Sequence, residues 1–400
     1  MKKLLIAALA LAASASSASA QTGAAGPIRI GDINSYSGMA LFTEPYRKGA
    51  QLALEQVNAA GGVLGRRLEV VYRDDAVKAG DAVRHAEELV SSEKVSALAG
   101  GFTSSVCLAL ADFAQQRKVP FVCGIAVSDA VIWEKGNRFT FRTAQSTTMQ
   151  AGMLAEAAAK LPAKRWATVA PNYEYGTSFV AAFKKRLSAL RPDVTWVSEQ
   201  WPALGKMDPG PTIDALSAAK PDAIFNVTFG TDLVRFVREG NTRGFFKGKD
   251  VVSALTGQPE YLDTLKDETP EGWVVTGYPW QTFGEADHVA FRKAYQAKFK
   301  DYPRWGSVLG YTTYMALAGA IKAAGSTDGE KIADAFRGLT VPGPLGPVTY
   351  RAADHQATIS FFVGKLAKKD GNGVMTDWRL VQGEDYLPPP DEAAALRPKN

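Results

Sequence analysis

Two kinds of segment alternate along the chain from Ile28 onward: short apolar runs rich in β-branched residues, and longer segments with apolar residues at helical spacing. The short runs predict strands within residues 28–34, 66–75, 95–101, 119–124, 138–144, 165–172, 193–203, 222–230, 250–257 and 272–280. The longer segments predict helices at residues 46–60, 81–92 and 178–190. Repeated strand–helix–strand units are typical of parallel sheets flanked by helices, with ligands bound beyond the carboxyl ends of the strands.

The alternation runs twice, first up to about Phe141 and again from about Met149 to Trp273. Mainly helical segments follow at residues 286–303, 307–325 and 328–339, and strands return within 346–367. A chain of about 380 residues also exceeds the size at which one core keeps growing. We therefore expect an α/β fold of two Rossmann-like lobes, each with a parallel sheet flanked by helices.

Residues 1–20 have the features of a secretory signal peptide: two lysines, a short apolar core and the cleavage sequence Ala18-Ser19-Ala20. Loss of Lys2 and Lys3 lowers the formal net charge from +5 to +3, and no basic block remains, which argues against nucleic acid as a partner. The residue directly after the expected cleavage site is Gln21 and not a cysteine, so we expect no lipid anchor there, and no later apolar run is long enough for a membrane helix. We expect a periplasmic protein that is cleaved after Ala20.

Cys107 and Cys123 are the only cysteines. Export permits a disulfide between them, but two small buried residues beside a sheet would give the same pattern. The sequence leaves both alternatives open.

The turn "GGFTSS" at residues 100–105 joins a predicted strand to a helix and could serve several chemistries. It lacks the G-x-S-x-G spacing of a nucleophile elbow, and His85, His288 and His355 are expected to be solvated rather than catalytic. Phosphate-binding glycine motifs and metal-ligand clusters are also missing from the sequence, so we expect no cofactor and no metal. Anion capture at the helix start, by Ser104 and Ser105, is the remaining functional interpretation, beside ordinary helix capping.

Aromatic residues gather at the predicted strand-to-helix transitions. Phe42, Phe102, Tyr173, Tyr175 and Phe229 all lie at such positions. Aromatic rings at one edge of facing sheets favour a cleft that stacks an apolar or aromatic ligand.

With these residues in view, the chain resembles the type I periplasmic solute-binding proteins of ABC transporters, of the branched-chain amino acid (leucine/isoleucine/valine) binding family. The matching pieces occur in family order: "IRIGDINSYSG", "NAAGGVLGRRLEVVYRDD", "VSALAGGFTSS", "FRTAQSTTMQAGML", "VAPNYEYGTSF", "AKPDAIFNVTFG" and "PEGWVVTGYPW". The resemblance implies two lobes joined by three hinge strands, with Ser104 on the ligand carboxylate and Tyr175 closing from the second lobe. The family threonine is replaced by Val127, so that contact would come from the Ala126 backbone or from Ser128.

A second departure concerns the glutamate that pairs with the ligand's ammonium in amino acid binders of this family. The alignment places Leu255 or Thr256 at that position, and Glu260 follows a few residues later. A buried ammonium without a partner is costly. Either Glu260 or Asp232 therefore substitutes, or the ligand is an aromatic or other amphipathic acid without an ammonium.

The resemblance implies a monomeric, non-enzymatic protein that delivers a small carboxylate to an inner-membrane permease. Lobe boundaries are expected at residues 28–143 plus 277–346 for the first lobe and 144–276 plus 347–388 for the second, with a tail at 389–400. Hinges are expected at residues 141–145, 276–280 and 343–350. A ligand sensor of the same fold and a secreted hydrolase are the alternatives.

Overall fold

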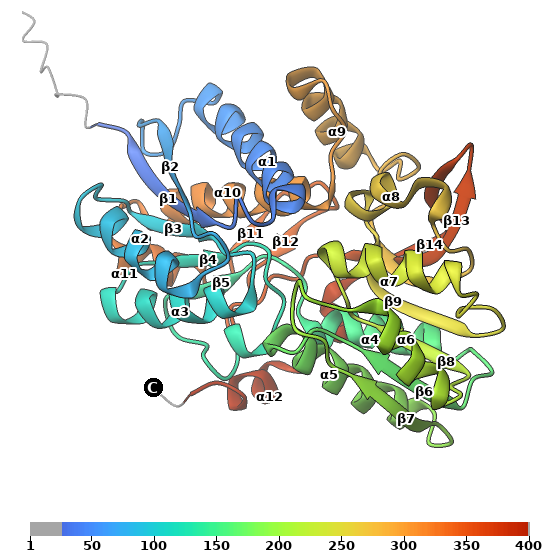
Figure 1. The fold of residues 1–400 in the computed structure, drawn as a ribbon. Coiled ribbons are helices and arrows are strands. Elements are labelled where there is room, and N and C mark those ends of the chain that lie inside the picture. Colours follow the sequence, from blue (N-terminus) through green and yellow to red (C-terminus); the bar gives the residue numbers. More distant parts are fainter. Residues whose placement is uncertain (1–25, 399–400) are drawn as a thin grey trace, which may run out of the picture.

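The computed structural model describes residues 26–398 of the chain (Figure 1). The expected signal peptide and its cleavage site lie outside the described residues. Within residues 26–398, no helix is both long enough and apolar enough to cross a membrane.

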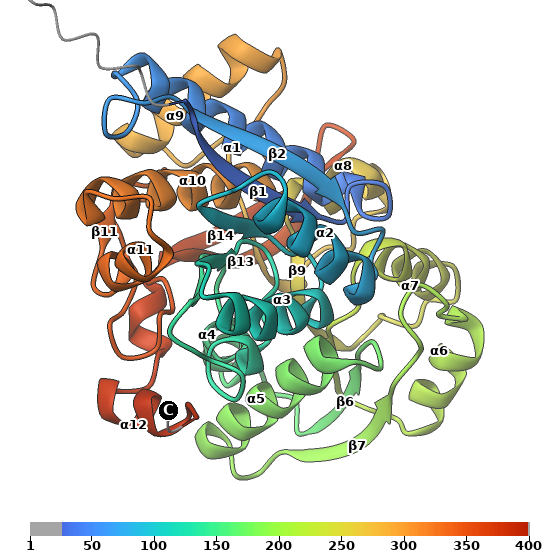
Figure 2. The same cartoon turned by 90° about the vertical axis from the view of Figure 1, so that its left-hand side faces the viewer.

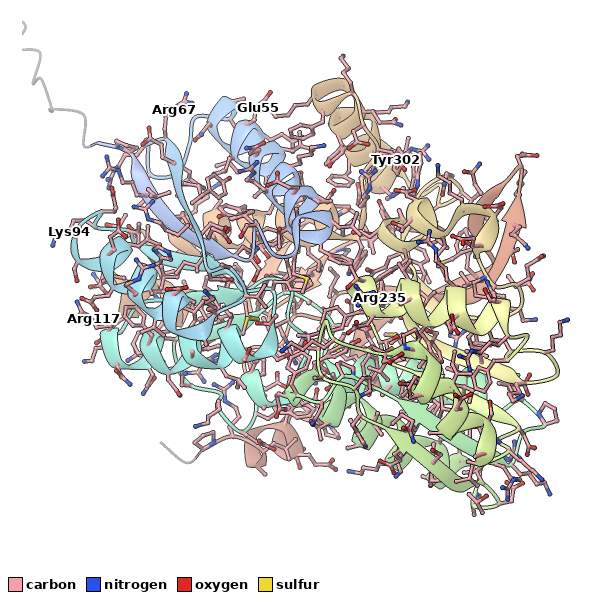
Figure 3. The ribbon with its side chains drawn as sticks, viewed as in Figure 1. Glu55, Arg67, Lys94, Arg117, Arg235 and Tyr302 are labelled. Atoms are coloured by element: carbon pink, nitrogen blue, oxygen red, sulfur yellow. A yellow bond between two sulfur atoms is a disulfide. The ribbon has the colours of Figure 1, made fainter. Side chains whose placement is uncertain are left out.

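The first sheet has five parallel strands in the order β2-β1-β3-β4-β5. Its strands are β1 (Ile28–Asn34), β2 (Leu68–Asp74), β3 (Ala97–Gly100), β4 (Phe121–Cys123) and β5 (Thr140–Arg142). The helices of this lobe are α1 (Ala40–Ala59), α2 (Ala79–Ser91), α3 (Ser104–Arg117), α9 (Ala286–Phe299), α10 (Trp305–Ala324) and α11 (Gly329–Phe336). Charged side chains such as Arg67, Lys94 and Arg117 project from its outer surface (Figure 3).

The second sheet has seven strands in the order β14-β13-β10-β9-β8-β6-β7. Its parallel strands are β6 (Arg165–Val169), β7 (Thr195–Gln200), β8 (Ala223–Asn226), β9 (Asp250–Gly257) and β10 (Val274–Gly277). The helices around it are α4 (Thr147–Ala158), α5 (Glu174–Leu190), α6 (Pro209–Ala218), α7 (Gly230–Thr242) and α8 (Pro259–Leu265). All ten segments predicted as strands contain one, and the predicted helices are confirmed.

The second sheet is parallel except at one edge. β13 (Phe361–Lys369) and β14 (Asn372–Val381) form a hairpin that adds to β10 antiparallel. The two-residue turn, Asp370-Gly371, has positive φ at both positions, 51° and 74°. Asp-Gly favours such turns, whose twist matches that of the flanking strands, so the sequence held a hairpin signal at this edge.

The chain passes between the lobes after β5, through residues 143–146, and after β10, through residues 278–285. These passages overlap the first two expected hinges. The third expected hinge, residues 343–350, instead forms the turn and second strand of a small hairpin, β11 (Thr340–Val341) with β12 (Val348–Thr349), beside α10. The chain first pairs with β5 through Gln356 and then enters the second sheet at β13. The expected lobe boundaries stay a prediction.

Two of the three histidines are buried, which corrects the expectation that they are solvated. His288 contacts the Tyr278 hydroxyl at 2.7 Å and the Phe283 carbonyl at 2.9 Å, and burial lowers its pKa to about 4. His355 bonds to the Thr140 carbonyl at 3.0 Å, and burial lowers its pKa to about 3. A neutral imidazole with hydrogen-bond partners can be buried at little cost, which residue type alone does not reveal. His85 lies on α2 and is half-buried.

Candidate functional site

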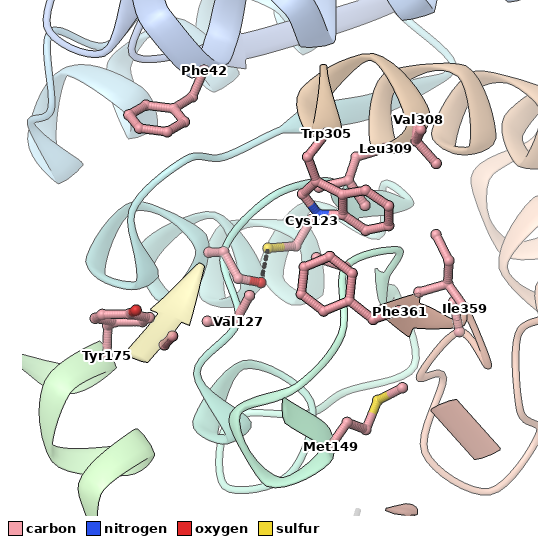
Figure 4. Close-up of a cluster of buried hydrophobic side chains, with 14 of the residues drawn as sticks. Phe42, Cys123, Val127, Met149, Tyr175, Trp305, Val308, Leu309, Ile359 and Phe361 are labelled. Atoms are coloured by element: carbon pink, nitrogen blue, oxygen red, sulfur yellow. Dashed lines mark hydrogen bonds between the residues drawn. The ribbon is translucent and has the colours of Figure 1, made fainter. Parts of the chain in front are cut away.

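A cavity lies between the two lobes, at the carboxyl edges of both sheets. From the first lobe and its first passage it is lined by Phe42, Phe102, Ser104, Ile125, Ala126, Val127, Ala144, Trp305, Gly306 and Leu309. From the second lobe it is lined by Gln150, Tyr173, Tyr175, Phe229, Leu255, Gln258, Glu260 and Tyr261. Figure 4 shows Phe42, Val127 and Tyr175 approaching this region from three separate parts of the chain, and Trp305 and Leu309 approaching it from α10. The cavity leaves about 70 Å³ for the centres of water-sized molecules, several times the roughly 10–15 Å³ that one water needs.

The start of α3 forms one part of the wall. Gly100 ends β3 and Gly101 follows it, with φ of 109° and 79°, and a Cβ on Gly100 would lie 2.2 Å from the Ile33 carbonyl oxygen. Thr103 is the N-cap of α3, and its side chain accepts a hydrogen bond from the Val106 amide. Ser104 is the first residue of the helix and is 1% exposed. The free backbone N–H groups of a first helical turn, together with this hydroxyl, suit a carboxylate.

A disulfide between Cys107 and Cys123 settles the question that the sequence left open. The two Cα atoms are 6.0 Å apart, and both residues are fully buried. The bond joins α3 to the end of β4, three residues before Ala126. It therefore connects the two parts of the first lobe that contribute Ser104 and Ala126 to the cavity.

Aromatic rings from both lobes meet around the cavity. Phe42 lies 5.4 Å from Phe102 and 5.4 Å from Tyr261, and Phe102 lies 6.1 Å from Phe229, between ring centroids. The Tyr175 ring packs edge-on against Phe229 at 5.3 Å. Because α8 and α7 belong to the second lobe, these contacts hold the lobes together across the cavity and present it with apolar ring faces.

Glu260, in the first turn of α8, is the buried carboxyl of the site. Its Oε1 accepts a hydrogen bond from the Gly306 amide, 3.1 Å away, at the start of α10 in the other lobe. Its Oε2 is buried and has no hydrogen-bond partner among residues 26–398. Burial raises the pKa of Glu260 to about 7, although the Gly306 amide and Arg304 act in the opposite direction.

Asp232, the other candidate for an ammonium partner, is engaged elsewhere. Its carboxylate accepts hydrogen bonds from the Gly205 amide at 2.7 Å and the Met207 amide at 3.3 Å. It lies outside the cavity wall, in a separate hollow that shares Phe42 and Phe229 with the cavity. Of the two acidic residues, Glu260 is therefore the one that faces the cavity.

Leu255 lies in the cavity wall, at or next to the position where amino acid binders of this family are expected to have the glutamate that pairs with the ligand's ammonium. Its φ is 65°, an uncommon value for a residue with a side chain, and its amide donates to Thr276 Oγ1 at 2.9 Å. Strained backbone of this kind is maintained when the surroundings fix it. The departure from the family pattern thus places an apolar side chain in the wall.

Seven of the ten expected ligand contacts line the cavity: Phe42, Phe102, Ser104, Ala126, Tyr173, Tyr175 and Phe229. Three do not. Ser105 is exposed because it faces away from the wall along α3. Ser128 Oγ donates to Glu174 Oε1 at 2.7 Å, and Thr256 shares a 2.6 Å hydrogen bond with Ser253 inside the sheet.

Several wall residues were missed from the sequence. They are Gln150, Gln258, Tyr261 and Trp305, with the apolar residues Ile125, Leu309 and Ala144. Gln258 directly follows β9, so its position at a strand end was a usable signal. Trp305 is distant in sequence and joins the wall only because α10 begins there.

Two α/β lobes with a small cavity between their sheet edges are the arrangement expected of a solute-binding protein. Comparison with known proteins gives the family. Residues 27–372 match the periplasmic binding protein family model, and the chain belongs to this family. It is a periplasmic binding protein of the ABC transporter type, and such proteins bind small molecules and work with permeases rather than as enzymes.

A named relative and two solved structures that resemble this chain are binding proteins of the same kind. The "Leu/Ile/Val-binding protein homolog 8" of Brucella abortus is 26% identical over 338 residues, covering 80% of this chain and 82% of the relative. A solute-binding protein of an ABC transporter from Rhodopseudomonas palustris, solved with 3,4-dihydroxybenzoic acid, is 25% identical, with a TM-score of 0.81 and coverage of 89% and 98%. A leucine-binding protein from Thermotoga maritima shares the fold at 24% identity, with a TM-score of 0.78 and coverage of 90% and 99%.

Proposed function

We propose that this protein captures an apolar or aromatic amino acid between its closing lobes and delivers it, as a monomer, to an inner-membrane ABC permease. The ligand carboxylate would sit at the start of α3 beside Ser104. The ammonium would pair with Glu260, and the side chain would lie among the aromatic rings. The observation that carries the proposal is the buried Oε2 of Glu260, which has no hydrogen-bond partner among residues 26–398.

The energetic argument concerns an unsatisfied buried group. A carboxylate oxygen removed from water without a partner costs free energy, and a cation beside it removes that cost. Glu260 Oε1 already has the Gly306 amide, so Oε2 is the atom available for the ligand. An ammonium donates up to three hydrogen bonds, which Glu260 and the amide oxygens of Gln150 and Gln258 could accept.

A second candidate ligand is an amine-free aromatic acid with a hydroxyl group. The Rhodopseudomonas palustris structure holds 3,4-dihydroxybenzoic acid, and the cavity here is lined with aromatic rings. Because burial raises the pKa of Glu260 to about 7, its carboxyl is partly protonated near neutral pH and can share a proton with a phenol hydroxyl.

A thermal-shift comparison of matched pairs separates these candidates. The mature protein, residues 21–400, is unfolded, freed of ligand and refolded. It is then tested with leucine against 4-methyl-2-oxopentanoate, and with phenylalanine against cinnamate and 4-hydroxybenzoate. A ligand that binds only the folded state at a hundred times its Kd adds about 2.7 kcal/mol, enough to raise the melting temperature by a few degrees.

Stabilisation by an amino acid but not by its amine-free partner supports the pairing with Glu260. Stabilisation by the amine-free acids alone favours the second candidate. A ligand sensor of the same fold is the remaining alternative, and binding of the same ligands without stimulation of a permease would support it.

A further inference from the structure

The C-terminal segment makes contacts with both lobes after the chain has left the second sheet. We propose that residues 382–397 form a strap, a fourth connection between the lobes that limits how far the cleft opens. The proposal goes beyond ligand capture and does not depend on the identity of the ligand.

The strap is anchored first on the second lobe. Tyr386 donates from its hydroxyl to Glu156 Oε2, on α4, at 2.6 Å. Its ring lies against Gly152, where a Cβ would come within 2.6 Å of the Tyr386 ring. Arg186 of α5 donates to the other oxygen of Glu156 at 2.9 Å, which fixes the acceptor.

The second anchor is on the first lobe and begins two residues later. Arg351 donates to the Pro388 carbonyl at 2.9 Å and is itself held by Asp354 through hydrogen bonds of 3.0 and 2.9 Å. Asp354 is fully buried and also accepts from the Trp133 indole at 3.2 Å. Trp133 and the segment around Asp354 belong to the first lobe, because Gln356 pairs with Arg142 at the end of β5.

The strap continues as the short helix α12 (Pro390–Ala395), which borders a surface hollow together with Trp133 of the first lobe and Arg186 of α5. Ala393 on this helix is fully buried, whereas its neighbour Ala394 is exposed. Arg397 then donates to the Asn137 carbonyl at 2.7 Å. In Figure 1, α12 lies below α3 and beside α5, and Figure 2 shows it at the lower edge of the molecule near α5.

The shortness of the connection gives the strap its mechanical effect. Tyr386 is bonded to one lobe and Pro388 to the other, and two residues span at most about 7 Å. An opening that moves these anchors farther apart must break one of them. The strap therefore disfavours wide opening and keeps the unliganded protein near the ligand-competent arrangement, which raises apparent affinity.

The test measures lobe separation without any ligand. Cysteines replace Arg67 in the first lobe and Arg235 in the second, which are both exposed and are labelled in Figure 3, and carry spin labels. The native cysteines are already paired with each other, so they stay unlabelled. Pulsed electron resonance then gives the distribution of distances between the two labels.

Three changes are compared in this labelled protein. Removal of residues 388–400, and Ala393→Asp, which places a carboxylate in a buried position, should shift the distribution to longer distances and broaden it. Ala394→Asp, the exposed neighbour, should leave it unchanged. If the first two variants fail to melt cooperatively, Arg397→Gln and Tyr386→Phe, which each remove one anchor, take their place. Distances equal to those of the unmodified chain in folded strap variants would overturn the proposal.

Discussion

At the scale of single residues, the site depends on where buried polar atoms find partners. Glu260 has one oxygen on the Gly306 amide and one without a partner among the described residues. Asp232 has the same charge, but backbone amides of the second lobe occupy it. The sequence alone offered Glu260 and Asp232 equally as partners for a ligand ammonium. The structure separates them, because backbone amides already hydrogen-bond to Asp232 whereas one oxygen of Glu260 has no such partner among the described residues.

Replacement of Glu260 tests the ammonium pairing directly. Glu260→Gln keeps the size of the side chain and removes its negative charge, and a hydrogen bond to a charged group contributes about 1.5–3 kcal/mol. We expect amino acid affinity, measured by isothermal titration at pH 8, to fall by at least about tenfold. Glu268→Gln, an exposed carboxylate on the same lobe, is the matched control and should bind like the unmodified protein.

The pH dependence of ligand affinity also tests the pairing of the ammonium with Glu260, because the pairing predicts the direction in which affinity changes with pH. Burial raises the pKa of Glu260 to about 7 from its usual 4.5, so between those values the unliganded folded protein holds a proton that the unfolded chain has lost. The contribution of Glu260 to stability thus falls as pH rises through this interval. An ammonium ligand selects the ionised form, so its affinity should rise from pH 6 to 8. A flat or falling profile that Glu260→Gln does not alter would contradict the pairing.

At the scale of elements, the contact between α1 and α10 determines where the cavity wall stands. Three glycines let the two helices approach: a Cβ would lie 2.1 Å from the Ser307 oxygen at Gly49, 2.5 Å from the Phe42 oxygen at Gly306, and 2.0 Å from the Tyr46 oxygen at Gly310. The neighbours are backbone atoms, which cannot rotate away. Since α10 begins at Trp305, this close packing also positions the part of the wall that receives Glu260.

Gly310→Ala should therefore destabilise the protein, although alanine is the better helix former. Overpacking of this kind costs roughly 1–3 kcal/mol or more, because the methyl group forces α1 and α10 apart. Gly80→Ala in α2 is the matched control: nothing lies within 4 Å of its Cβ, and its φ is not positive. It should be neutral or stabilise by up to about 1 kcal/mol. Denaturant unfolding measures both changes, and equal effects would show that the helix approach is not tight.

At the scale of the whole molecule, the proposed capture of a ligand requires the two lobes to move about their connections. Residues 143–146 form one of these, and the Ala144 carbonyl accepts a hydrogen bond from Gln356, in another passage, at 2.9 Å. Hinges act through changes in backbone angles at a few residues. The cross-lobe contacts of Phe42 with Tyr261 and of Ser128 with Glu174 give the arrangement that a bound ligand would stabilise.

Proline at Ala144 should impair closure, because it fixes φ at that residue and restricts the residue before it. We expect several-fold weaker ligand affinity and slower closure, followed by the fluorescence of Trp305 at the cavity wall. Ala203→Pro, in an exposed loop of the second lobe, controls for the general effect of a new proline. If both variants close and bind alike, residues 143–146 are not a hinge.

The sequence by itself determined the elements and much of one wall. Apolar runs and helical spacing are local properties, so each of the ten predicted strands was found. The turn "GGFTSS" and the aromatic residues at strand ends also indicated where ligand contacts gather, since carboxyl ends of parallel strands share an edge. The Asp370-Gly371 hairpin was equally local, and its signal was overlooked.

Only the tertiary structure decided which distant groups meet. The burial of His355 and the entry of Trp305 into the cavity depend on packing between segments far apart in the chain, and the pairing of Cys107 with Cys123 depends on how α3 packs beside β4. Exposure of Ser105 beside buried Ser104 depends on the direction in which α3 leaves the sheet. Partners for buried polar atoms come from whichever backbone lies nearby, and for Glu260 that backbone belongs to the opposite lobe.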